Sequence, residues 1–164
     1  MSDRRQWLVQ VFEDTQEYYA EDAVLAEAVK RSAADTVLYK PDDYPELPDN
    51  PGKACVVSVT QGKTFQTAMD LHRTETRTAV LNFASATTPG GGVKNGSSAQ
   101  EESLCRCSTL YPALTQKWLW EKYYAVNRAA RDVLHTDACI YTPGVLICKT
   151  DATIPQRMDT FVPV

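Results

Sequence analysis

The chain has 164 residues, of which 43% are hydrophobic and 23% charged, the size and composition of one globular domain with a sizeable core. Its formal net charge of -4 gives no sign of a broad basic surface, so binding to a nucleic-acid backbone is disfavoured. No apolar run approaches the roughly 20 residues that span a bilayer. The N-terminus also lacks the apolar stretch of a signal peptide, so we expect a cytoplasmic protein with no membrane partner.

The N-terminal region has the pattern of two amphipathic helices. Apolar or amphipathic side chains recur mostly three or four residues apart over residues 4–19, and the pattern repeats over residues 22–34. A short strand is predicted at residues 36–39, and the prolines of residues 41–52 predict a surface loop. We therefore expect residues 1–40 to form a helical extension that packs on the domain that follows.

The domain predicted at residues 53–164 begins with a strand, a helix and a second strand. Residues 55–60 and 78–84 are apolar runs that contain β-branched residues, and a helical pattern at residues 64–71 separates them. This order predicts an α/β fold in which the two strands pair in parallel.

A loop rich in glycine and serine follows at residues 87–99. Helices are predicted after it at residues 100–111 and 118–134, and short strands at residues 138–141 and 145–148. The aromatic side chains of the second helix suggest adenine stacking as one interpretation. Their dense spacing is more typical of a helix that buries one side, so we expect core roles for Trp118, Trp120, Tyr123 and Tyr124.

The cysteines form neither a disulfide framework nor a zinc framework. Their number is odd and no pair has C-x-x-C spacing, so reduced thiols are expected at Cys55, Cys105, Cys107, Cys139 and Cys148. Two of them, Cys105 and Cys107, lie two residues apart on a predicted helix and face different directions. Core packing is therefore their expected role.

The segment most informative about function contains Gly90-Gly91-Gly92, a spacer of seven residues and Gln100-Glu101-Glu102. Three consecutive glycines after a strand let backbone N–H groups turn toward a bound anion, and a diphosphate fits that description. The first turn of the following helix also favours negative charge.

The adjacent acids Glu101 and Glu102 have two interpretations. Ser98 and Glu101 have the S-x-x-E spacing of a capping box, and spacing alone favours this ordinary role. Alternatively, one carboxyl faces the glycine loop and acts as a general acid on a glycosidic oxygen. Adjacent helical residues point about 100° apart, so the two acids need different roles.

The glycine run, the spacer and Gln100-Glu101-Glu102 resemble the signature of the poly(ADP-ribose) glycohydrolases. The flanking Asn82-Phe83-Ala84 and residues 103–111 resemble the microbial branch of that family. The resemblance implies a macrodomain-like three-layer α/β/α sandwich with a mixed sheet, preceded by the N-terminal helices. It also implies an exo-acting hydrolase without metal or cofactor, which acts on poly(ADP-ribose) or an ADP-ribosylated protein and releases ADP-ribose.

The resemblance also assigns roles to individual residues. Glu102 matches the catalytic acid of the family, and Glu101 matches the neighbour that orients the ribose hydroxyls. Many members carry an asparagine where this chain has Ser85. The residues expected to bind substrate are Gly90, Gly91, Gly92, Gln100, Asn82 and Ser85.

The resemblance implies that relatives continue past the position of Val164, so we expect the chain to lack the C-terminal part of the family fold. The apolar residues 161–164 predict the start of a core strand. An unpaired sheet edge is usually covered by another chain, and a homodimer is the expected cover. Two alternatives to the enzyme are a non-catalytic module that binds ADP-ribose and an inactive fragment.

Overall fold

The computed structural model describes residues 3–43, 46, 52, 54–74 and 77–164. The loop predicted at residues 41–52 lies for the most part outside the described residues. In chain order the elements are α1 (Asp3–Glu21), α2 (Ala23–Asp35), β1 (Val37–Tyr39), α3 (Thr64–His72), η1 (Val93–Asn95), α4 (Gln100–Cys107), α5 (Leu110–Leu114), α6 (Lys117–Leu119), η2 (Trp120–Tyr124), α7 (Ala125–Ala130), β2 (Cys139–Tyr141), β3 (Leu146–Lys149) and β4 (Arg157–Pro163).

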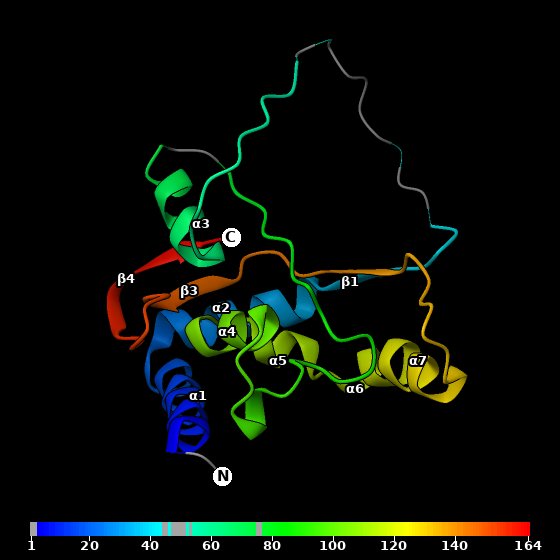
Figure 1. The fold of residues 1–164 in the computed structure, drawn as a ribbon, viewed down its shortest axis with the longest axis horizontal. Helices are drawn as coiled ribbons and strands as arrows, with labels where there is room; N and C mark the ends of the chain where they lie inside the picture. Colours follow the sequence, from blue (N-terminus) through cyan, green and yellow to red (C-terminus); the bar gives the residue numbers. More distant parts are fainter. Residues whose placement is uncertain (1–2, 44–45, 47–51, 53, 75–76) are drawn as a thin grey trace.

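Two small antiparallel sheets lie among the helices of the described residues, so the chain is a mixed α/β protein. β1 pairs with β2, and β3 pairs with β4. The β3–β4 hairpin lies between helices, because α2 and α4 contact β3 while α3 contacts β4 (Figure 1). No helix in the described part of the chain has the length and hydropathy of a transmembrane span.

The amphipathic pattern of the N-terminal residues forms α1 and α2, which confirms both predicted helices. Leu8, Phe12 and Thr15 are buried on one face of α1. The ring of Phe12 packs edge-on against Tyr111 with 4.9 Å between ring centroids. The carboxylate of Asp22 accepts hydrogen bonds from the first backbone N–H groups of α2 and caps this helix.

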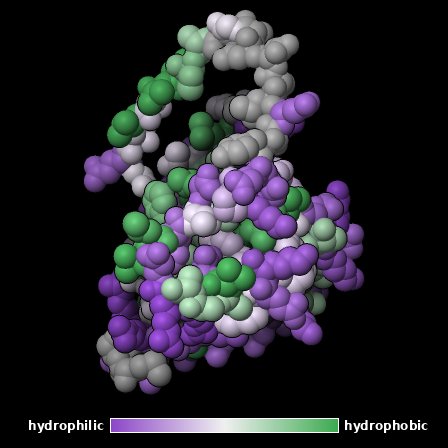
Figure 2. Space-filling view, turned by 90° about the vertical axis from the view of Figure 1, so that its right-hand side faces the viewer, coloured by the Kyte–Doolittle hydropathy of each residue, from purple (hydrophilic) through white to green (hydrophobic). Residues whose placement is uncertain are grey.

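The strands predicted at residues 55–60 and 78–84, and their parallel pairing, are wrong for this structure. Both segments lie outside every strand of the described chain. Most of their apolar side chains are exposed, to 92% for Val56 and to 72% for Phe83, although Val80 packs partly buried against the core. Figure 2 shows hydrophobic side chains along the segment that rises above the rest of the chain. A strand requires a hydrogen-bonded neighbour as well as a suitable composition, and neither segment has a strand partner among the described residues.

Ser108 divides the helix predicted at residues 100–111 into α4 and α5. Ser108 has an extended backbone and forms an isolated bridge with Ile147 of β3. Its Oγ donates a hydrogen bond to the carbonyl of Leu104 and accepts one from the N–H of Leu110. The serine side chain thus binds both the last turn of α4 and the first residue of α5, and the prediction of a continuous helix is wrong here.

The helix predicted at residues 118–134 consists of α6, the π-helical segment η2 and α7. It ends four residues early because Arg131 adopts a left-handed conformation with φ of 53°. Tyr124 is fully buried, which agrees with its predicted core role, whereas Trp120 keeps 36% of its surface exposed.

The short strands predicted at residues 138–141 and 145–148 are confirmed as β2 and β3. The apolar residues 161–163 form the end of β4 and not the start of a core strand, so that prediction is wrong; none of them is buried, although Val162 and Val164 pack partly buried against the core. Val162 pairs with Ile147, and the N–H of Val164 donates to the carbonyl of Val145 at 2.9 Å.

Three buried thiols pack where α4 meets the β3–β4 hairpin. Cys105 and Cys107 belong to the main hydrophobic core, which confirms their predicted role. Cys148 of β3 is also fully buried. Burial raises the pKa of the Cys107 and Cys148 thiols to about 12 and that of Cys105 further still.

A buried lysine connects β3 to α1. The ammonium of Lys149, a residue with 1% exposure, lies 2.6 Å from a carboxylate oxygen of Asp14 and donates to the carbonyl of Val11 at 2.8 Å. Arg157 of β4 binds the same carboxylate. Hydrogen bonds from Arg157 first, and then from Lys149, hold the pKa of Asp14 below its ordinary value against the opposing effect of burial.

We predict that Asp14→Asn destabilises the fold by about 2 kcal/mol, because it leaves the buried ammonium of Lys149 without its counter-charge. The loss falls below that of a fully buried pair because the Asp14 side chain is 45% exposed. Urea unfolding measures the loss of unfolding free energy. Asp70→Asn is the control, because it breaks the exposed ion pair with Arg73. Equal losses in the two variants would contradict the prediction. Because folding lowers the pKa of Asp14, its contribution is present above the unfolded value of about 3.9 and is lost as the pH falls through the folded value.

Candidate active site

The predicted site residues come together where three segments meet. These segments are the extended residues 77–86, the loop at residues 87–99 and the first turn of α4. Gly90, Gly91 and Gly92 lie in turns between them, which confirms the predicted loop. The helix begins at Gln100 instead of near Ser98.

Gly91 lies directly against both acids of the first helical turn. Its φ is 56°, a left-handed conformation that glycine adopts easily. A Cβ at this position would lie 2.5 Å from Oε1 of Glu102 and 3.2 Å from Oε2 of Glu101. The missing side chain is therefore what allows two carboxylates to approach the loop backbone.

Glu101 is held by donors on both of its oxygens. Its side chain is buried, Oε1 accepts from the N–H of Gly90 at 3.1 Å, and Oε2 accepts from the N–H of Ser85 at 2.8 Å. Burial raises the pKa of Glu101, while these hydrogen bonds and one from the Asn82 side chain oppose the rise. The capping box is wrong, because Ala99 is the N-cap and the Glu101 carboxylate faces the loop instead.

Glu102 differs from its neighbour in having one unoccupied oxygen. It is also buried, and its Oε1 accepts from the N–H of Gly92 at 2.9 Å. Its Oε2 is buried and has no hydrogen-bond partner among the described residues. The two acids therefore have different environments, as the separation of their directions on the helix requires.

The N–H groups of the three glycines are occupied within the chain. Gly90 and Gly92 donate to the two carboxylates, and Gly91 donates to the carbonyl of Thr88 at 2.9 Å. In this structure the backbone of the loop therefore binds the carboxyl groups of α4. The contacts of the glycines with a diphosphate remain a prediction.

The other three predicted residues lie in the same cluster. The hydroxyl of Ser85 accepts from the N–H groups of Thr87 and Thr88, so it stabilises the local turn. Asn82 has a buried Oδ1 without a partner in the described chain. Gln100 uses both ends of its carboxamide on the backbone of the segment that contains Asn82.

Sequence reasoning missed a buried arginine behind the loop. Arg106 lies one helical turn after Glu102, is 2% exposed, and donates to the carbonyl of Ser97 at 2.6 Å. Burial lowers the pKa of its guanidinium. Nearby, Gly96 contacts the backbone of Arg5, so that α1 supports the far side of the loop. The sequence could have indicated this arginine, because Arg106 follows Glu102 by four residues and therefore lies on the same helix face.

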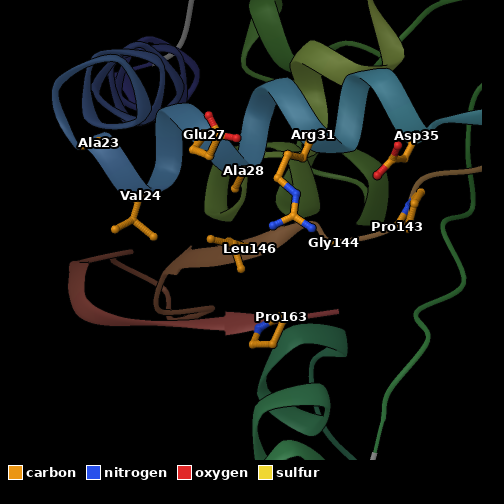
Figure 3. A pocket seen from close by; sticks show the side chains of 10 residues that line it. All are labelled: Ala23, Val24, Glu27, Ala28, Arg31, Asp35, Pro143, Gly144, Leu146 and Pro163. Atoms are coloured by element: carbon orange, nitrogen blue, oxygen red, sulfur yellow. The ribbon is translucent and has the colours of Figure 1, made fainter.

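A cavity of about 700 Å³ lies elsewhere, between α2 and the β3–β4 hairpin (Figure 3). Glu27, Arg31 and Asp35 line its helical wall, and Pro143, Gly144 and Pro163 lie opposite. It contains none of the predicted site residues. Across the described ranges, no group of three or more His, Cys, Asp or Glu side chains is placed to hold a metal ion.

Comparisons with known proteins relate this geometry to one family. The family model of the microbial-type PARG catalytic domain matches residues 9–150. The structure resembles poly(ADP-ribose) glycohydrolase from Thermomonospora curvata with 29% identity and a TM-score of 0.81, over 100% of this chain and 62% of that chain. It also resembles poly(ADP-ribose) glycohydrolase from Deinococcus radiodurans in complex with ADP-ribose, with 36% identity and a TM-score of 0.70, over 83% of this chain and 54% of that chain. A search of curated proteins finds no match.

The chain therefore spans 62% of the first of these structures and 54% of the second. The family match covers the glycine loop, both buried acids and most of the remaining chain. The chain belongs to the microbial-type PARG catalytic-domain family.

Proposed function

We propose that this chain carries the catalytic site of a poly(ADP-ribose) glycohydrolase, which hydrolyses the ribose–ribose O-glycosidic bonds of ADP-ribose polymers and releases ADP-ribose. The observation that supports it most is the convergence of two adjacent buried carboxylates on Gly91. Family membership and the ADP-ribose bound to the D. radiodurans relative support the substrate class. The polymer or an ADP-ribosylated protein is the proposed partner.

The unequal hydrogen bonding of the two acids suggests that they have different roles in catalysis. Glu102 has one oxygen fixed by Gly92 and one without a partner among the described residues, so in its protonated form it can donate a proton through Oε2. The proton passes to the leaving ribose oxygen as the glycosidic C–O bond breaks. The same carboxylate then takes a proton from the water that attacks the oxocarbenium-like carbon.

Glu101 suits a positioning role because its oxygens already accept hydrogen bonds from Gly90 and Ser85. We propose that it orients the ribose hydroxyls. The proposed substrate contacts of the glycine loop, Gln100, Asn82 and Ser85 rest on the family resemblance and on their shared cluster. A macrodomain-like α/β/α sandwich is the proposed architecture, for which the similarity to the T. curvata enzyme is the support.

The two acids are expected to be separable by mutation. Glu102→Gln keeps the acceptor for Gly92 but cannot deliver a proton, so turnover falls by about 10²- to 10⁴-fold while ADP-ribose binding is retained. Glu101→Gln places an amide donor against the N–H groups of Gly90 or Ser85, so it weakens binding as well as turnover. Release of ADP-ribose from the polymer and calorimetric titration measure the two effects. Unchanged turnover in Glu102→Gln would refute the mechanism, and binding without turnover by the unmutated chain would favour the non-catalytic module.

The glycine loop gives a second test. Gly91→Ala forces a side chain into a left-handed conformation and against the carboxylate of Glu102, so ADP-ribose affinity is expected to fall by at least about tenfold. Gly144→Ala is the matched control, since its φ is 69° but its Cβ would lie at an ordinary 3.7 Å from Ser32. Both variants lose about 1 kcal/mol of stability from the backbone conformation. Equal ADP-ribose affinities of the Gly91→Ala and Gly144→Ala variants would count against a role for Gly91 in the site.

We further propose a homodimer that covers the C-terminal edge and the exposed apolar residues that precede α3. β4 pairs with β3 on one edge only among the described strands, and Val57 and Val59 are 83% and 96% exposed. Light scattering is expected to give the mass of a dimer, and the double substitution of Val57 and Val59 by Lys is expected to shift it toward the monomer. A monomer at every concentration of the unmutated chain would remove this proposal.

A further inference from the structure

The side chain of Gln100 binds the main chain of the extended segment that precedes the glycine loop. Its Oε1 accepts from the N–H of Phe83 at 2.8 Å, and its Nε2 donates to the carbonyl of Leu81 at 2.7 Å. The orientation of the carboxamide is fixed by these partners, because a carbonyl can only accept and an N–H can only donate. Nε2 also lies 3.4 Å from the hydroxyl of Thr64 at the start of α3.

This pair of hydrogen bonds has the pattern of a parallel β-bridge. In a parallel ladder, one residue offers its N–H and its carbonyl to the two residues that flank its partner. The carboxamide of Gln100 donates an N–H to Leu81 and accepts one from Phe83, and these two residues flank Asn82. Since residues 77–85 lie in no strand, the carboxamide supplies bonds that a neighbouring strand would otherwise make.

The hydrogen bonds of Gln100 also determine which side chains face the site. Successive side chains of an extended segment point to opposite faces. Leu81 and Phe83 are 72% exposed, whereas Val80 packs against the core and Asn82 has a buried Oδ1. A shift of one residue would exchange the two faces and turn Asn82 toward the exposed face.

We propose that Gln100 is a positioning residue, whose carboxamide acts as a strand partner and fixes the register of residues 81–83. In this register the N–H of Ser85 donates to Glu101, and Oδ1 of Asn82 is buried. The effect on catalysis rests on the proposed function, whereas the structural effect on the segment does not. The role differs from the predicted substrate contact, because both ends of the carboxamide are already bound to the main chain.

Amide hydrogen exchange of the ligand-free chain tests the structural effect directly. Gln100→Met keeps the length and helix propensity of the side chain but removes both hydrogen bonds. Exchange at the Phe83 N–H is expected to become roughly 5- to 30-fold faster, as the loss of hydrogen bonds of ordinary strength implies. Gln66→Met is the matched control, because Gln66 is an exposed residue of α3 that binds Asp70. It is expected to leave Phe83 exchange unchanged.

Gln100→Glu tests the positioning role through its pH dependence. Above neutral pH the carboxylate still accepts from the N–H of Phe83 but has no hydrogen for the carbonyl of Leu81. Protonation near a pKa of about 4.3 restores this donor. The ADP-ribose affinity of this variant, relative to the unmutated chain at the same pH, is therefore expected to be lower at pH 8 and to recover toward pH 4.5.

The outcomes separate the two parts of the inference. Unchanged Phe83 exchange in Gln100→Met overturns it, and so does faster exchange with undiminished ADP-ribose affinity. If Gln100→Met does not fold, a relative affinity of Gln100→Glu that does not vary with pH overturns the inference instead. If the unmutated chain does not bind ADP-ribose, the proposed function is wrong, while the exchange rates still decide whether Gln100 holds the segment.

Discussion

The site depends on the hydrogen bonds between the backbone of the glycine loop and the two carboxylates of α4. A buried carboxylate needs hydrogen-bond donors, because its charge has lost the solvation that water would give. Gly90 and Gly92 supply these donors, and Gly91 leaves the space in which both acids fit. The loop and the acids thus stabilise each other, and neither would keep its conformation if the other were displaced.

Other side chains pack against the parts of the glycine loop that the two acids do not contact. Arg106 binds the carbonyl of Ser97, and Tyr111 packs under Gly90 so closely that no side chain would fit there. Phe12 of α1 packs on the same tyrosine. The N-terminal helix therefore contributes to the shape of the site, although the division of the chain at residue 40 remains a prediction.

Local patterns predicted the two N-terminal helices and the glycine loop, because periodicity and three glycines act over a few residues. They did not decide the role of Glu101, since a capping box and a site acid share the same spacing from Ser98. The segments at residues 55–60 and 78–84 have the composition of strands, but strand formation depends on partners remote in sequence, and Val56 and Phe83 are exposed instead. The role of Ser85 was also hidden, because its backbone N–H binds the acid.

The buried thiols behind α4 have a consequence for chemical reactivity. Burial raises the pKa of Cys107 and Cys148 to about 12, so both are protonated near neutral pH and react slowly with oxidants and alkylating reagents. Cys55 and Cys139 are exposed and remain accessible to the same reagents. Alkylation of Cys107 would therefore require α4 to separate from β3, and its rate would report how often the support of the two acids opens.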